Sequence, residues 1–409
     1  MAESTDAAIT IGSRIRRARR TKKMSQATLA GFVERSESWM RGIEAGRINL
    51  DKHSVIDRLA SVLEVDVAWL LGQPFEFGQD NGHDAVPVLR RALRRTSITL
   101  SGGSVHPKTP RPLLTDLRAD VDRITRRRQA ANLFEVMRQL PELTESLNTS
   151  ALLASGVERD VVDGLIIETS HVARTVLNQL GYHDLAWTAV ENAATAAARL
   201  GDPLMSACSA WDRCGVLLHT DEDDEAFMIA EAALADLQDL MTAPTPQVLS
   251  LWGALHLRCA VASARHHDAP TAWAYLAAAE AAAARLGVDR NDFQTVFGPT
   301  NCGIHATEIA VALDQPDIAL KRHAGIDLTV LASKERHTRH RIEVARAYGQ
   351  LKRDAAAVDQ LKRGAHLAPQ YVYNHPTVRD LVDELCHRAQ PSAVDAGLGA
   401  IERAITRST

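Results

Sequence analysis

The feature that most constrains the fold is the helical pattern running from Leu113 to the end of the 409-residue chain. Apolar residues recur there at the spacing of helix faces, breakers interrupt them roughly every 15 to 25 residues, and strand-like alternation is absent. Aromatic residues make up only 4% of the chain, whereas alanine is abundant. Because alanine favours helices and small side chains let helices pack closely, the sequence predicts an all-α protein.

Weak internal repeats divide this helical region. One alanine stands just inside each of several predicted helices, after an acidic or proline-containing turn, at Ala186, Ala226, Ala272, Ala319 and Ala357. The last unit has the fullest pattern, with Ala345, Tyr348, Ala357, Leu361 and Pro369 in place and Gly364 where alanine is usual. This pattern resembles the tetratricopeptide repeat (TPR), which implies a TPR-like α-solenoid over residues 113–409 with a concave binding surface.

The N-terminal region predicts five short helices. Ser25 and Ser36 are N-cap candidates for the second and third helices, and Gly46 is expected to end the third. The residues that define the helices are Ile11, Ile15 and Ala18; Ala27, Leu29, Ala30 and Val33; Trp39, Met40 and Ile43; residues 55–63; and residues 67–71. Trp39 and Met40 are expected in the core rather than against thymine methyl groups.

Charge is distributed unevenly along the chain. Residues 1–130 contain 23 basic and 15 acidic residues, a net charge of +8, whereas the remainder carries −12. A basic N-terminal region (the head, residues 1–130) followed by an acidic remainder (the body) indicates that the head binds a polyanion. A solvated helix face remains the alternative for the arginines of the first helix, which are Arg14, Arg16, Arg17 and Arg20.

The run from Ser25-Gln26 through Leu29-Ala30 and Ser36-Glu37-Ser38 to Ile43-Glu44-Ala45-Gly46 resembles the Cro/phage-repressor (XRE) helix-turn-helix family over residues 10–72. The chain departs from the family pattern at the turn, where Glu34 replaces the usual glycine. The resemblance implies a five-helix DNA-binding domain whose third helix lies in the major groove. It also implies that Arg19 and Glu44 form an internal ion pair.

The same resemblance assigns candidate DNA contacts. The residues placed to face base edges are Ser36, Glu37, Ser38 and Arg41. The residues placed to hold phosphates are Gln26, Arg47 and Asn49. Residues 73–112 follow as a predicted linker, because glycine, serine and proline are frequent there, with one short basic helix from Val88 to Arg95. Its arginines either touch phosphate or form a solvated face.

Ligand candidates in the helical body are less specific. Asn301 and His305 lie one turn apart after a helix break at residues 297–300, and Arg336 and Arg339 belong to a basic segment suited to an anionic group. The alternative for the basic segment is a solvated helix face. Further candidates for the concave face are Asn192, Trp252 and Arg258.

Several functional classes are disfavoured by the sequence. The chain has no HExxH, GxSxG, P-loop or Rossmann glycine motif, so neither an enzyme nor a cofactor is expected. The five cysteines show no CxxC pair, which favours buried thiols over a metal site. No apolar stretch is long enough to span a membrane and the N-terminus lacks a leader pattern, so the sequence predicts a cytoplasmic protein.

Together these patterns predict a transcription regulator that binds double-stranded DNA as a homodimer and senses a peptide or small-molecule effector. The combination of head and body resembles a group of actinobacterial regulators and, more loosely, bacterial peptide-sensing regulators. Two alternatives remain open. One is a constitutive DNA binder whose body only dimerises, and the other is a protein-interaction scaffold that uses the repeats and not the DNA-binding head.

Overall fold

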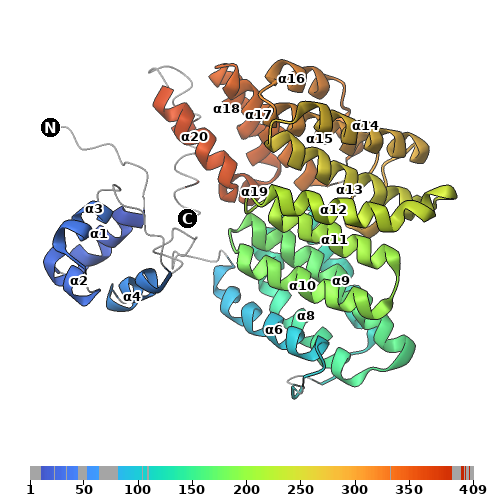
Figure 1. Cartoon of the computed structure of the whole chain (residues 1–409), viewed down its shortest axis with the longest axis horizontal. Helices are drawn as coiled ribbons and strands as arrows, with labels where there is room; N and C mark the ends of the chain where they lie inside the picture. The colour runs from blue at the N-terminus through green and yellow to red at the C-terminus, as the bar shows by residue number, and fades with distance from the viewer. Residues whose placement is uncertain are drawn as a thin grey trace. The chain divides into compact units, whose positions relative to one another are not determined.

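The computed structural model describes residues 11–22, 24–33, 35–44, 53–63, 82–103, 105–107, 110–331 and 333–388, with residues 398, 399, 401 and 405. The chain divides into two compact units, residues 1–79 with residue 409, and residues 80–408, called here the N-terminal unit and the repeat unit. The described residues form an all-α fold (Figure 1). Among them, pairing of the β type is limited to one isolated bridge between Arg290 and Phe297.

The N-terminal unit begins with four short helices at the predicted places. They are α1 (Ile11–Thr21), α2 (Gln26–Phe32), α3 (Glu37–Glu44) and α4 (His53–Leu63). The Ser25 hydroxyl accepts a hydrogen bond from the Thr28 amide at 3.0 Å, and the Ser36 hydroxyl accepts one from the Trp39 amide at 3.2 Å. Both predicted N-caps are therefore confirmed. The predictions for Glu34, Gly46 and residues 67–71 lie outside the described residues.

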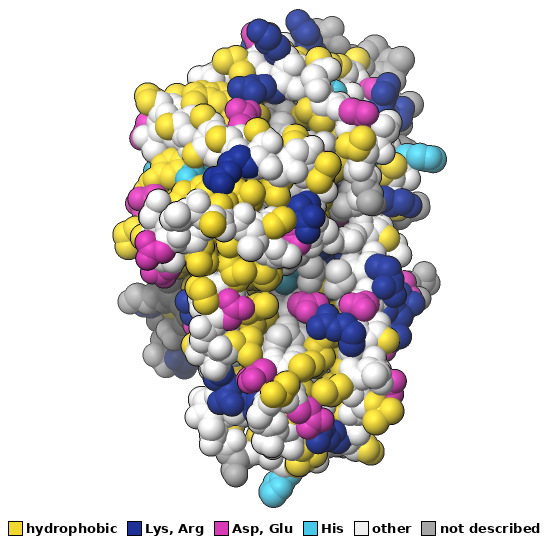
Figure 2. Space-filling view, turned by 90° about the vertical axis from the view of Figure 1, so that its right-hand side faces the viewer, with side chains coloured by type: hydrophobic (Ala, Val, Ile, Leu, Met, Phe, Trp, Pro, Cys, Tyr) yellow, Lys and Arg dark blue, Asp and Glu magenta, His cyan; other side chains and the backbone are white. Residues whose placement is uncertain are grey.

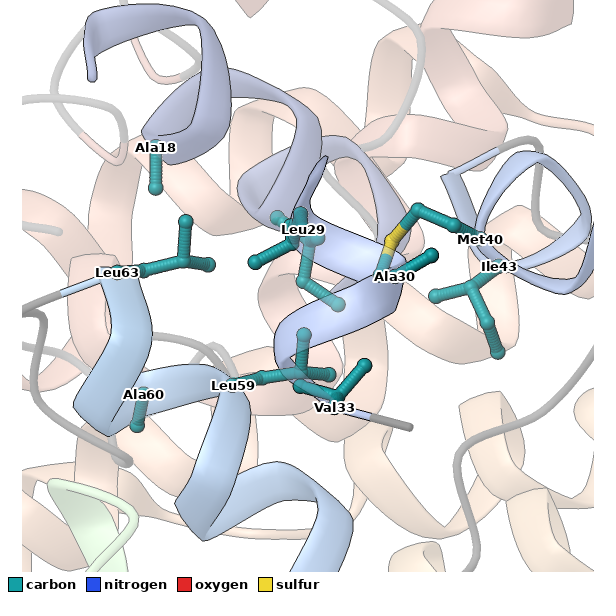
Figure 3. Close-up of a cluster of buried hydrophobic side chains, with 10 residues drawn as sticks. Ala18, Leu29, Ala30, Val33, Met40, Ile43, Leu59, Ala60 and Leu63 are labelled. Carbon is teal, nitrogen blue, oxygen red and sulfur yellow. The ribbon is translucent and has the colours of Figure 1, made fainter. Parts of the chain in front are cut away.

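One apolar core joins these four helices. Figure 3 shows side chains from all four pointing toward a common centre. The buried members are Ile15, Ala18, Leu29, Ala30, Val33, Met40, Ile43, Leu59, Ala60 and Leu63. Met40 is fully buried and Trp39 packs partly buried against the cluster, so both belong to the core, as the sequence predicted.

The approach of α1 to α3 requires glycine at position 12. A Cβ atom there would lie 2.0 Å from the carbonyl oxygen of Ile43, whereas a Cβ at Gly31 on α2 would meet nothing within 4 Å. We expect Gly12→Ala to destabilise the N-terminal unit by about 1–3 kcal/mol, because backbone must move to relieve the clash. Gly31→Ala should stabilise it by about 0.5–1 kcal/mol, because alanine loses less entropy in a helix. Amide hydrogen exchange over α1–α4 in the full chain measures both changes, and two shifts of the same sign would contradict this packing.

The repeat unit contains six helical hairpins in sequence (Figure 1). The pairs are α7 (Leu114–Gln129) with α8 (Leu133–Leu153), α9 (Gly156–Gln179) with α10 (His183–Leu200), α11 (Pro203–Leu217) with α12 (Asp223–Leu237), α13 (Pro246–Arg265) with α14 (Ala269–Leu286), α15 (Pro299–Ala312) with α16 (Pro316–Ala324), and α17 (Lys334–Gln350) with α18 (Asp354–Leu367). The first helix of each hairpin contacts the first helix of the next. Two short helices, α19 (Pro369–Asn374) and α20 (Pro376–Arg388), follow the last pair.

Every hairpin turns in the same way. A residue with left-handed backbone stands two positions before the second helix, at Ala131, Gly181, Asp221, His267, Asp314 and Lys352. The next amide then bonds back into the first helix, as in the 2.8 Å bond from the Gln315 amide to the Ala310 carbonyl, which satisfies carbonyls at the helix end.

The repeated alanines have one structural role. Each is the fourth residue of a second helix, from α10 to α18, and each is fully buried: Ala186, Ala226, Ala272, Ala319 and Ala357. The predicted solenoid repeat is thus confirmed. In α8 the equivalent position holds Val136, also fully buried, which explains why the alanine pattern did not include the first hairpin.

The predicted linker is corrected by the structure. Its basic helix is longer than the predicted Val88–Arg95 and forms α6 (Val86–Leu100), which packs against α8 and α10. The repeat unit therefore starts at residue 80 rather than residue 113. Leu89, Leu93 and Leu100 are buried on its inner face, and the energy of burying this apolar face outweighs the flexibility expected from the surrounding glycines and prolines. Arg95 bonds Glu145 at 2.9 Å, while Arg91 and Arg94 stay exposed.

No helix among the described residues has the length and apolarity needed to cross a membrane. On the face shown in Figure 2, acidic and basic side chains lie interspersed among apolar ones, without a continuous field of either sign.

Candidate functional site

Helix α3 carries the predicted base-reading residues on its outer side. Glu37, Ser38 and Arg41 are exposed, whereas Met40 and Ile43 are buried in the core. Arg41 and Glu37 stand one helical turn apart and form an ion pair at 3.1 Å, with their side chains 59% and 50% exposed. Such an exposed pair is weak, so both side chains remain available to another partner.

Ser36 has a different local role from its neighbours. Its hydroxyl caps α3 and also lies 2.9 Å from the Ser38 hydroxyl. The Arg35 guanidinium stands over the Trp39 ring at 5.7 Å from the ring centroid. Ser36 therefore fixes the start of α3, and the side chains best placed to meet a base edge belong to Glu37, Ser38 and Arg41.

A buried ion pair fixes α3 to α1. Arg19 Nε donates to Glu44 Oε1 at 2.6 Å, and Arg19 Nη2 donates to Oε2 at 2.9 Å. Gln26 Nε2 donates to the same Oε2 at 2.7 Å, which ties the start of α2 to the end of α3. Burial raises the pKa of Glu44, but the hydrogen bonds from Arg19 and Gln26 outweigh this and lower the pKa overall. The predicted Arg19–Glu44 pair is confirmed.

The predicted phosphate contacts are only partly described. Gln26 is half-buried and its side-chain nitrogen is bonded to Glu44, while Arg47 and Asn49 lie outside the described residues. On α1, Arg16 is exposed, whereas Arg14 is half-buried and its pKa is lowered by desolvation. Arg16 therefore has the more solvent-accessible guanidinium of these two.

In the repeat unit, four of the predicted ligand residues meet at one cavity. Arg258 on α13, Asn301 and His305 on α15, and Arg336 on α17 line it together with Trp211. The cavity holds about 10 Å³, enough for roughly one water molecule. Asn301 is 2% and His305 5% exposed, and no hydrogen bond reaches Asn301 Oδ1 from the described residues. The four side chains come from three successive first helices of the solenoid.

A second cavity, of about 30 Å³, adjoins these residues and has a positive lining. Its charged walls are Arg128, Arg174, Arg258, Arg336 and Arg339, with Glu335 as the carboxylate. Three of the arginines have acidic partners: Glu335 lies 2.5 Å from Arg128, Asp212 lies 2.8 Å from Arg174, and Glu308 lies 2.7 Å from Arg339.

Arg258 and Arg336 lack such a partner. No carboxylate among the described residues lies within 4.0 Å of either guanidinium. Burial and the neighbouring arginines lower the pKa of Arg258 to about 9, and its guanidinium stands 4.9 Å from the Trp211 ring centroid. Two buried cations without an ion pair give this cavity an excess of positive charge.

Two predicted ligand residues are placed elsewhere. Asn192 lies between α10 and α6, where its amide donates to the Leu93 carbonyl at 3.0 Å and accepts from Ser97 at 2.7 Å. Trp252 lies one helical turn before His256 on α13, with 4.8 Å between the two ring centroids. The structure does not bring these two residues together with the other candidates.

The sequence reasoning missed several members of the cluster. They are Arg128, His171, Arg174, Asp212, Glu335 and Tyr371, all buried. A signal for some of them does exist, because Asp212 and His171 interrupt stretches of small and apolar residues that otherwise form buried helix faces. A charged residue at such a position is buried and needs a partner, which points to a polar interior.

Comparison with known proteins supports the first unit. A family model described as a helix-turn-helix domain matches residues 10–70, so the N-terminal unit is a helix-turn-helix domain and the match supports a DNA-binding regulator. No curated protein matches the chain. One similar solved structure is Bacillus thuringiensis PlcR in complex with the peptide PapR7 and DNA, at 12% identity and a TM-score of 0.33, covering 68% of this chain and 96% of that one. This likeness is too weak to support a conclusion about the fold or function of this chain.

Proposed function

We propose that this protein is a sequence-specific transcription regulator that reads double-stranded DNA with α3. The observation that carries the proposal is the two-sided character of α3, which buries Met40 and Ile43 and exposes Glu37, Ser38 and Arg41. An arginine on such a helix matches the O6 and N7 acceptors of guanine, and a glutamate accepts from cytosine N4. Gln26, Arg47 and Asn49 are proposed to hold the adjacent phosphates.

The proposed assembly is a homodimer in the cytoplasm. A single reading helix covers only a few base pairs, and two heads related by a two-fold axis would match half-sites one or more helical turns apart. We assign the surface for this pairing to the repeat unit. Sedimentation of the purified chain, alone and with a palindromic fragment, measures the stoichiometry directly.

We expect Arg41→Ala to reduce discrimination between the preferred DNA site and random DNA by about 10- to 100-fold, the effect of losing one bidentate base contact. Binding to random DNA should change little, because phosphates supply that affinity. The measurement is competition binding on the full chain at fixed salt. Arg91→Ala, which removes an exposed arginine from α6, is the matched control. An unchanged ratio in Arg41→Ala would assign the reading to other residues.

We further propose that the repeat unit senses an effector with an anionic group, a peptide or a small molecule. Support comes from Arg258 and Arg336, two buried cations beside Asn301 and His305. Both arginines also line the adjoining cavity of about 30 Å³, and a carboxylate that enters it would neutralise charge that the described residues leave unpaired. Thermal shifts with peptide pools carrying free C-termini, against the same pools amidated, test this, because a ligand of the folded state raises the melting temperature. Equal shifts for the two pools would contradict an anionic requirement.

A further inference from the structure

A larger cavity in the repeat unit lies outside the arginine-lined space. It has a volume of about 340 Å³, within the size range of small-molecule sites, and is walled by α7, α9, α11 and η3 (Asp292–Gln294). Its polar walls include Asp122, Thr125, Glu168 and His171, and its apolar walls include Ile167 and Phe293. It shares only His171 with the arginine cavity.

His171 lines this cavity with a ring that carries a hydrogen-bond acceptor. The ring is 3% exposed and stacks on Trp211 with an interplanar angle of 12°. Its Nδ1 lies 2.7 Å from Asp212 Oδ1, whereas Nε2 has no hydrogen-bond partner among the described residues. Burial lowers the pKa of His171 to about 4, although Asp212 opposes this, so the ring is neutral at pH 7. A neutral ring that donates from Nδ1 to a carboxylate leaves Nε2 as an acceptor.

The charged side chains among the cavity's other walls are both acidic. Asp122 and Glu168 are carboxylates, and no lysine or arginine lines the cavity. Arg118, from outside the lining, bonds Glu168 at 2.8 Å and lies 3.8 Å from Asp122, and the two carboxylate side chains remain 37% and 47% exposed. The buried Thr125 hydroxyl has no hydrogen-bond partner among the described residues. The cavity therefore combines two polar atoms without a partner among the described residues, two carboxylates that share one arginine and so carry a net charge of −1, and an apolar wall.

We propose that this cavity binds a small organic cation, an amine carried on an apolar body, with its N–H groups toward His171 and its charge toward Asp122 and Glu168. The apolar body would pack against Ile167, Met205 and Phe293. Unpaired buried acceptors are costly, and a cationic donor satisfies them while its charge is balanced by the two carboxylates. This site is separate from the proposed anionic effector site and does not depend on DNA binding.

The test uses the full chain and three probes with closely related skeletons: tryptamine, N-acetyltryptamine and indole-3-propionate. We expect tryptamine to raise the melting temperature further at each higher concentration, following RT ln(1 + [L]/Kd), and the neutral and anionic analogues to have little effect. The assay contains no DNA, so its failure and the failure of the DNA-binding proposal are distinguishable. Equal shifts for the three probes, or no shift with tryptamine at millimolar concentration, would overturn the proposal.

Variants locate the binding. A Cβ at Gly164, which lines the cavity on α9, meets nothing within 4 Å, so Gly164→Leu should fold and fill the space. We expect it to abolish the tryptamine shift. Asp122→Asn and Glu168→Gln should each weaken binding about tenfold, as loss of one charge-assisted contact predicts. Asp160→Asn, an exposed carboxylate on the same helix, is the matched control. Unchanged binding in all three cavity variants would place the amine elsewhere.

Discussion

Replacing Glu44 with alanine is expected to unfold the N-terminal unit and abolish DNA binding by the full chain. The Glu44 carboxylate accepts two hydrogen bonds from Arg19 and one from Gln26, and Arg19 is 8% exposed. Removing one partner of a buried ion pair leaves an unpaired charge, which costs about 3–5 kcal/mol. Domains have stabilities of roughly 0.05–0.15 kcal/mol per residue, so this loss is comparable to the whole stability of a unit this small.

Glu37→Ala provides the matched comparison on the same helix. It breaks the exposed pair with Arg41, which contributes less than about 1 kcal/mol, so the unit should stay folded. Amide hydrogen exchange of α1–α4 separates the two outcomes, because protection in the repeat unit serves as an internal reference. Similar loss of protection in both variants would show that the buried Arg19–Glu44 pair contributes no more to stability than the exposed Glu37–Arg41 pair.

Acidification from pH 7 to pH 5 should strongly destabilise the repeat unit. Burial lowers the pKa of His83, His171 and His305 to about 4, and that of His340 and His375 to about 3. The unfolded chain binds these protons near pH 6.5, so stability is full above that pH and is lost as pH falls toward the folded values. At pH 5 each histidine costs about 2 kcal/mol, and two of them equal a large part of a domain's stability.

Chemical denaturation at pH 8, 7, 6 and 5 measures this effect. We expect no change between pH 8 and 7, where these histidines are neutral in both states, and a steep fall below pH 6.5. Besides burial, His323, Arg341 and His337 lower the pKa of His340, so His340→Leu should reduce the slope by about 1.4 kcal/mol per pH unit. A stability that stays constant down to pH 5 would mean that these rings are hydrated.

The parts of the fold predicted from sequence are those set by local rules. Three such features depend on neighbours within a few residues: the serine caps at Ser25 and Ser36, the apolar spacing in α1–α4, and the alanine that is the fourth residue of each second helix from α10 to α18. Local patterns therefore located the helices and the repeats. The Arg19–Glu44 pair spans 25 residues, so apolar periodicity does not predict it. The resemblance to a helix-turn-helix family did predict this pair.

The parts that could not be predicted depend on distant contacts. Arg128 pairs with Glu335, which lies 207 residues later, and no local pattern links them. Helix α6 stands in a segment with the composition of a linker, and only its packing on α8 and α10 reveals its place in the repeat unit. The cavity of the amine proposal is walled partly by Phe293 and Gln294, whose left-handed backbone is not encoded by a glycine.

The central claim is that α3 reads bases in the major groove, and selection of DNA fragments by the full chain tests it most directly. Purified protein is mixed with genomic fragments at rising salt and the retained DNA is sequenced. The account predicts one shared motif that survives higher salt than random DNA and is lost in Arg41→Ala. Retention of no fragment at low salt would contradict the account, and partners that persist after nuclease treatment would then favour a protein-interaction scaffold built on the repeats.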